Sequence, residues 1–227
     1  AAEPLPAPQD AVWGGVAGLA GLGGLVALYR ALASGRMGIA APVSGVLTAG
    51  LPVLFSIGSS GLPTVLQMAG FGLAFLAIWL VSAAPTGGGK AGNIGLAILA
   101  GSGFGIFFIL MDQIHTGAVF WPLVAARCAS VTVMLGFMLS KHRANAVLPG
   151  SRSLVGLVLL SSALDVAGNV FFLAATQAGR LDIAAVVSSL YPASTILLAR
   201  LVIKEQLSQI QLAGVLAALA AIVLITL

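Results

Sequence analysis

Apolar stretches of about 20 residues alternate with short polar breaks along the whole chain, and about 20 residues is the length that a helix needs to cross roughly 30 Å of hydrocarbon. The breaks contain Gly, Pro or charged residues, as in 84–93, 141–152 and 177–182. This pattern predicts an all-α fold, a polytopic bundle of transmembrane helices. The eight predicted spans are 11–31, 38–57, 62–83, 93–113, 119–140, 153–174, 182–203 and 208–226.

Composition indicates which solvent surrounds this bundle. Of the 227 residues, 59% are hydrophobic and 7% are charged, whereas a soluble domain carries about a quarter charged residues. The apolar residues exceed what one soluble core could hide, so the lipid bilayer is the expected partner of most of the surface. The net charge of +4 is not gathered into a cluster of Lys and Arg with interleaved aromatic residues, so nucleic acid is not an expected partner.

The chain is similar to itself at a fixed offset. Shifting the sequence by 144 residues, without a gap, superimposes 11–80 on 155–224. Matches at Ala, Leu and Gly arise by chance in membrane segments, but matches at Arg, Ser and Gln in one register indicate a duplication. The matching pairs include Arg36 with Arg180, Ser44 with Ser188, and Gln67 with Gln211.

The two copies begin five spans apart. Because five is an odd number, the copies are expected to cross the membrane in opposite senses, which makes an inverted repeat. Many secondary transporters are built in this way, since two mirrored halves give inward-open and outward-open states of similar energy. The repeat therefore favours a solute carrier that works by alternating access.

The C-terminal segment 181–227, LDIAAVVSSLYPASTILLARLVIKEQLSQIQLAGVLAALAAIVLITL, resembles the end of an EamA-type domain of the drug/metabolite transporter (DMT) superfamily. The mirrored stretch 31–80 is a weaker copy, and Arg127 falls where that family often carries an Arg in its seventh helix. The resemblance rests on a run of small residues followed by Pro192, Glu205, Gln211 and Gly214.

This resemblance implies ten spans in two five-helix repeats, whereas the chain shows three plus five. Residues 1–83 are therefore expected to form an N-terminal repeat without its first two helices, 84–92 a linker, and 93–227 a complete C-terminal repeat. Gly61 stands where the second copy has Glu205. The resemblance also implies a multi-pass protein of the plasma (inner) membrane that carries small metabolites such as amino acids or amphiphilic compounds, with protons as a candidate coupling ion.

Asp165 is the first candidate for a site, because ionisable groups at membrane depth are expensive and suggest function. Ser161, Asp165 and Asn169 follow one another at intervals of four residues, and Gln177 lies two turns further on. This spacing draws a polar stripe along one helix. The stripe faces either a water-filled cavity or partner helices, and the sequence leaves both readings open.

Arg127 is the second candidate. It lies eight residues into its span, and Asp165 lies nine residues from the end of the next, antiparallel span. At 1.5 Å rise per residue, both charges sit roughly 12–14 Å below the same surface. Opposite charges at one depth on neighbouring helices predict an ion pair, which serves either transport or packing.

Further candidates interrupt or line the other spans. A proline inside a membrane helix frees a carbonyl and loosens the helix, which suits a hinge, although proline is also simply common there. The hinge candidates are Pro42, Pro52 and Pro192, and the remaining cavity candidates are Tyr191, Ser188 and Ser44. Two GxxxG pairs, Gly14 with Gly18 and Gly101 with Gly105, predict close helix packing.

Catalysis and cofactor binding have little support in the sequence. His115 and His142 fall in predicted loops and Cys128 is the only cysteine, so no span offers a nucleophile–histidine pair or a metal-binding cluster. We therefore expect no catalytic residue, metal or cofactor. An intramembrane enzyme and a non-transporting scaffold subunit remain the alternatives to a carrier.

Overall fold

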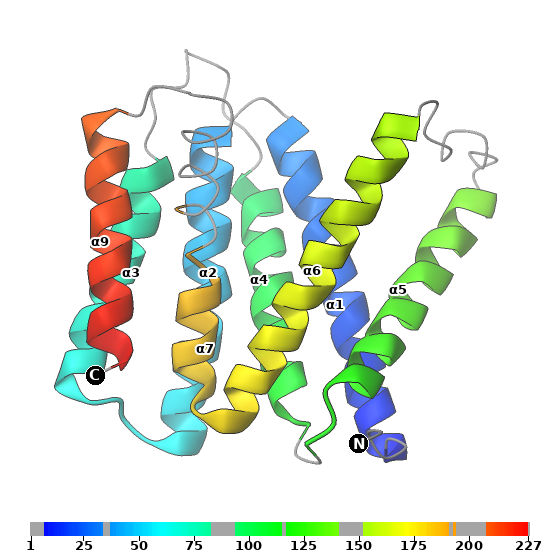
Figure 1. The fold of residues 1–227 in the computed structure, drawn as a ribbon, viewed down its shortest axis with the longest axis horizontal. Coiled ribbons are helices and arrows are strands. Elements are labelled where there is room, and N and C mark those ends of the chain that lie inside the picture. Colours follow the sequence, from blue (N-terminus) through cyan, green and yellow to red (C-terminus); the bar gives the residue numbers. More distant parts are fainter. Residues whose placement is uncertain are drawn as a thin grey trace. The chain divides into compact units, whose positions relative to one another are not determined.

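The computed structural model describes residues 7–33, 37–82, 94–114, 117–140, 152–190, 193 and 208–226. Within these ranges the chain forms eight α-helices and no strand, so the predicted all-α fold is confirmed for the described residues (Figure 1). The helices are α1 (Pro8–Ala33), α2 (Met37–Ser60), α3 (Val65–Ser82), α4 (Ile94–Asp112), α5 (Phe120–Ser140), α6 (Arg152–Ala178), α7 (Leu181–Ser188) and α9 (Gln209–Thr226).

Each of these helices begins within a few residues of a predicted span. Among the described residues, five helices are long and apolar enough to cross a membrane, namely α1, α2, α4, α5 and α6. The apolar parts of α3 and α9 are shorter, Val65–Leu80 and Gln209–Ile225. The predicted span 182–203 begins as α7, and most of its remainder, with Tyr191 and Pro192, lies outside the described residues, as do Glu205 and the linker 84–92.

The chain divides into two compact units. The first contains Ala1–Leu19 and Leu110–Ala178, and the second contains Ala20–Ile109 and Gly179–Leu227. Helices α5 and α6 therefore belong to the first unit, and helices α2, α3, α7 and α9 belong to the second. Helices α1 and α4 contribute residues to both units.

Two helix pairs organise the core of the second unit. Helix α3 packs along α9, and α2 packs along α7; in Figure 1 the members of each pair run in opposite directions. Small side chains let the helices approach closely, which matters in lipid because van der Waals packing drives helix association there. The buried apolar core consists of Ala49, Val53, Phe71, Ala74, Ala77, Ile78, Val186, Leu190, Ala218, Ala221 and Ile225.

The starts of α3 and α9 carry the same capping arrangement, the reciprocal pair of hydrogen bonds called a capping box. Thr64 N donates to Gln67 Oε1 at 3.0 Å, and Gln67 N donates to Thr64 Oγ1 at 3.2 Å. Ser208 N donates to Gln211 Oε1 at 2.9 Å, and Gln211 N donates to Ser208 Oγ at 3.2 Å. The two boxes lie 144 residues apart, so the glutamine match at this offset has a structural role.

Glycines permit close helix crossings in both units. In the second unit, a Cβ on Gly101 of α4 would lie 2.5 Å from the carbonyl oxygen of Ser44 in α2. In the first unit, a Cβ on Gly18 of α1 would lie 2.2 Å from the carbonyl oxygen of Ala126 in α5. Ser130 Oγ lies within hydrogen-bond distance of two carbonyl oxygens at this crossing, Gly18 O at 2.8 Å and Ala126 O at 2.7 Å, to which it can donate its one proton. The structure thus places Gly18 and Gly101 at helix crossings, as the GxxxG spacing predicted.

Helix α2 continues as an α-helix from Met37 to Ser60 through both of its internal prolines. The side chain of Pro52 is fully buried, and only the backbone of Pro42 is described. Neither proline ends the helix, because membrane helices re-satisfy the carbonyl that a proline frees. Their role as hinges remains a prediction.

Gly18→Ala tests the α1–α5 crossing. The added methyl group would meet backbone rather than a side chain that can rotate away, so we expect a loss of about 1–3 kcal/mol in the free energy of unfolding. Thermal unfolding in detergent, followed by circular dichroism, measures the effect. Gly23→Ala in the same helix is the matched control, because nothing lies within 4 Å of its Cβ position. Equal stabilities of the two variants would contradict the crossing.

Candidate functional site

An ion pair joins α5 and α6 in the first unit. Arg127 lies seven residues after Phe120, the first residue of α5. Asp165 lies in the middle of α6, thirteen residues from each end of Arg152–Ala178. Arg127 Nη2 donates to Asp165 Oδ2 and forms a salt bridge with it. The structure therefore brings together the two charges that the sequence placed at one depth.

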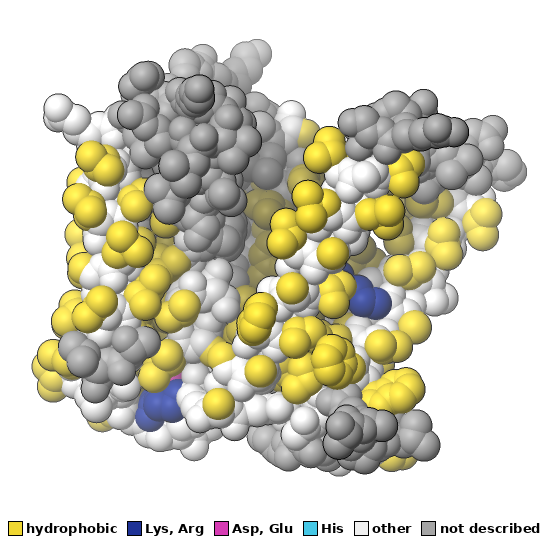
Figure 2. Space-filling view, viewed as in Figure 1, with side chains coloured by type: hydrophobic (Ala, Val, Ile, Leu, Met, Phe, Trp, Pro, Cys, Tyr) yellow, Lys and Arg dark blue, Asp and Glu magenta, His cyan; other side chains and the backbone are white. Residues whose placement is uncertain are grey.

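The ion pair is not enclosed by the chain. The side chain of Arg127 is 48% exposed and that of Asp165 is 57% exposed. Most of the surrounding surface is apolar, as the side chains along α5 and α6 show in Figure 2. Charged groups at membrane depth are costly and usually pair with one another, as Arg127 and Asp165 do here.

The rest of the polar stripe on α6 bonds to backbone. Asn169 Nδ2 donates to the carbonyl oxygen of Asp165 at 2.8 Å. Ser161 is exposed, and its Oγ donates to Val158 O, one turn back, at 3.0 Å. Gln177 Nε2 donates to Ala118 O at 3.0 Å, which ties the end of α6 to the segment before α5. Asp165 is thus the member of the stripe that reaches the side chain of a neighbouring helix.

A pocket of about 220 Å³ opens beside the ion pair, between α5 and α6. The residues that line it include Arg127, Cys128 and Asn169, but the surface that they and their neighbours present to it is almost entirely apolar. The remaining walls are the apolar side chains of Phe120, Leu123, Val124, Val166 and Val170. This arrangement can take a small apolar group, with the ion pair at its side.

The serine candidates Ser44 and Ser188 belong to the second unit. Ser44 is fully buried, and its carbonyl oxygen accepts a hydrogen bond from Thr48 Oγ1 at 2.7 Å. Ser188 is half-buried at the end of α7. The candidates Tyr191, Pro192 and Glu205 lie outside the described residues. The structure therefore brings Arg127, Asp165 and Asn169 together, whereas Ser161 lies about one turn before Asp165 on α6.

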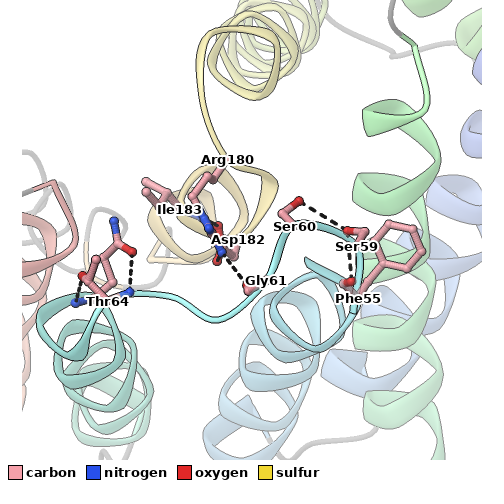
Figure 3. A network of polar contacts seen from close by, with 9 residues as sticks. Phe55, Ser59, Ser60, Gly61, Thr64, Arg180, Asp182 and Ile183 are labelled. Carbon is pink, nitrogen blue, oxygen red and sulfur yellow. Dashed lines mark hydrogen bonds and ion pairs between the residues drawn. The ribbon is translucent and has the colours of Figure 1, made fainter. Parts of the chain in front are cut away.

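Sequence reasoning missed a second charged cluster, at the start of α7 (Figure 3). The fully buried Asp182 accepts hydrogen bonds from Arg180 Nε at 3.1 Å, from Arg180 Nη2 at 2.9 Å and from Ile183 N at 2.9 Å. Arg180 Nη2 also donates to the carbonyl oxygen of Gly61, at 3.1 Å. The acid in the first turn of a helix was the available signal, because that position favours negative charge.

This second cluster has a structural role. Gly61 has a φ of +85°, a left-handed conformation that favours glycine, and Arg180 holds this turn against the start of α7. The hydrogen bond to Asp182 raises the pKa of the Arg180 guanidinium, so the arginine stays charged. Because Asp182 has no exposed side-chain surface, a solute cannot reach its carboxylate.

Comparison with known proteins agrees with this architecture. The family model of the EamA-like transporter family matches residues 92–227. A solved structure, described only as "Crystal structure of protein", aligns with a TM-score of 0.76 and 18% sequence identity, over 99% of this chain and 80% of that chain. At this identity the likeness concerns the fold alone. No curated protein matches the chain.

The family match covers more than half of the sequence. It includes both helices of the ion pair, α5 and α6, and both C-terminal helices of the second unit, α7 and α9. The chain belongs to the EamA-like transporter family, part of the drug/metabolite transporter superfamily.

Proposed function

We propose that the chain is a secondary carrier of the plasma (inner) membrane, and that it moves small metabolites by alternating access. EamA-like transporters are integral multi-pass membrane proteins that carry small molecules, so family membership supports this class. The family match gives no support to the alternatives, an intramembrane enzyme and a scaffold subunit. Amino acids and amphiphilic compounds are the proposed substrates, and the pocket between α5 and α6 is the proposed solute site.

One observation carries the assignment of the site: an ion pair at the middle of an apolar helix is about half exposed beside a pocket. A purely structural pair at this depth is expected to be enclosed and to use its remaining donors and acceptors within the protein, because desolvated charges are costly otherwise. The side chains of Arg127 and Asp165 are instead 48% and 57% exposed. Such groups are available to a solute.

The paired helices of the second unit support the proposed inverted repeat. At the 144-residue offset, α2 corresponds to α7 and α3 corresponds to α9. Each helix packs against its own counterpart, with the capping boxes of α3 and α9 at equivalent positions. A twofold axis in the membrane plane would produce this pairing, and it would relate the two states of an alternating-access carrier.

Asp165→Asn separates transport from packing, because it keeps the size of the side chain and removes its charge. If Asp165 serves transport, flux should fall about tenfold to a hundredfold, the equivalent of one charged hydrogen bond of about 1.5–3 kcal/mol, and the remaining flux should lose its pH dependence. Uptake of a panel of amino acids, amphiphilic acids and amphiphilic amines into cells or proteoliposomes measures this. Leu164→Asn, one residue away, is the matched control for introducing an amide.

The same variants test a purely structural role. In that case Asp165→Asn and Arg127→Gln would each strand one charge and lower thermal stability in detergent by similar amounts, and the double variant would recover much of the loss. Unchanged pH-dependent flux in a well-folded Asp165→Asn protein would count against the proposed site.

Cysteine labelling tests the inverted repeat. Val65 and Gln209 are the first residues of α3 and α9, are both exposed, and correspond at the 144-residue offset. With Cys128 replaced by Ser, we expect that Val65→Cys and Gln209→Cys react from opposite sides of the membrane. A membrane-impermeant maleimide should therefore label one of them in intact cells and the other only after permeabilisation. Labelling of both from one side would rule out the repeat.

A further inference from the structure

We infer that the hydrogen bond from Arg180 to Gly61 is a releasable latch: it holds the end of α2 against the start of α7, and it breaks when this end of the helix pair opens during transport. The inference rests on the proposed function and adds a conformational device to it. Three observations carry it, namely the place of this hydrogen bond between the two copies of the repeat, the partners that Arg180 keeps without it, and a buried hydroxyl group on α2.

The latch joins the two copies of the proposed repeat. Its donor, Arg180 Nη2, belongs to the second copy, and its acceptor, the carbonyl oxygen of Gly61, belongs to the first copy, 3.1 Å away (Figure 3). The helices that it connects, α2 and α7, correspond at the 144-residue offset and pack against each other. In a carrier built from an inverted repeat, one half moves against the other. A contact between the copies at the end of this helix pair must therefore break when that end opens.

Arg180 keeps its charged partner when the latch breaks. Its Nε and Nη2 donate to the two carboxylate oxygens of Asp182, and this pair lies within the second copy. Because the side chain of Asp182 has no exposed surface, loss of the pair would strand a buried charge, which is strongly destabilising. Loss of the latch strands no charge. The contact between the copies is thus the one that can be given up.

The latch is also a weak contact. Its acceptor is the neutral carbonyl of an exposed glycine, and the side chain of Arg180 is 29% exposed, so water can bind both groups once they separate. A hydrogen bond that is exchanged for water contributes little net free energy. The turn has little else to hold it: nothing lies within 4 Å of the Cβ position of Gly61, and Leu62 is 77% exposed.

A buried hydroxyl group near the latch favours opening. Ser56 lies five residues before Gly61 and is fully buried, and its Oγ finds no hydrogen-bond partner in the part of the chain that the structure describes. It shares a face of α2 with Ala49 and Val53, which pack in the core with Val186 of α7. A buried hydroxyl without a partner is destabilising. Separation of α2 from α7 at this end would let water reach it and remove that cost.

Substitutions at position 61 test the latch without disturbing Asp182. Gly61 has a φ of +85°, a conformation that Asn tolerates and that a β-branched residue avoids. Neither side chain would clash, since nothing lies within 4 Å of the Cβ position. Gly61→Val therefore forces the turn, with its carbonyl, out of the arrangement that Arg180 binds. Gly61→Asn is the matched control that keeps the turn, and thermal unfolding in detergent checks that both variants fold.

Ser56→Cys, in a background with Cys128→Ser, reports the opening in native membranes. A charged, membrane-impermeant methanethiosulfonate reagent should modify the introduced thiol slowly and from one side of the membrane, because water reaches it only while the latch is broken. Gly61→Val should raise the modification rate about twofold to tenfold, the equivalent of one hydrogen bond of about 0.5–1.5 kcal/mol. Gly61→Asn should leave the rate unchanged.

A double variant assigns the effect to Arg180. Arg180→Gln combined with Asp182→Asn removes both charges at once, so neither charge is stranded. It should raise the modification rate as much as Gly61→Val does. Adding Gly61→Val to it should give no further rise, because both changes remove the same contact.

Failure of the latch and failure of the carrier are distinguishable. Equal modification rates in the Gly61→Val protein and its parent, or equal rates from the two sides of the membrane, would overturn the latch. The proposed carrier would still stand in that case if flux of a compound in the transport panel depends on Asp165. If no compound shows flux while the modification rate still follows Gly61→Val, the contact opens but its role in transport is overturned together with the proposed function.

Discussion

The cost of charge in a membrane constrains the rest of this structure. Arg127 and Asp165 each stand well inside an apolar helix, where a single ionised group is unstable. Their salt bridge fixes which faces of α5 and α6 meet and at what height, and so it positions the pocket beside them. The same pair is about half exposed, and for that reason we propose it as part of the solute site.

Close backbone contacts hold the other helices together, because the hydrophobic effect does not drive helices to associate in lipid. Gly18 meets the backbone of α5, Gly101 meets the backbone of α2, and alanines fill the contact between α3 and α9. These close crossings leave little room for side chains between the helices. Polar side chains at the crossings therefore bond to backbone, as Ser130 does with Gly18, and the charged site occurs on α5 and α6 instead.

The sequence alone predicted the features that follow from the spacing of apolar stretches and from the depth of charged residues in the predicted spans. It located the helices within a few residues, and equal depth predicted the partners Arg127 and Asp165. It could not predict contacts that depend on side-chain direction. Gln67 and Gln211 were interpreted as signs of duplication, and the structure shows that they also cap α3 and α9. Asp182 was placed at the edge of a predicted loop, and the structure shows that it is buried and bound to Arg180. The pattern of Thr or Ser followed three residues later by Gln was the unused signal.

The most direct test of the solute site uses Cys128, the only cysteine in the sequence, which is exposed and lines the pocket. A thiol reacts as its thiolate, so it reacts with water-soluble reagents only where water reaches it. In native membranes, we expect that a charged methanethiosulfonate reagent modifies Cys128 and that a transported solute slows the modification. A Cys128 that stays unmodified, while Cys at position 65 in a Cys128→Ser background reacts fully, would contradict a water-filled solute site between α5 and α6.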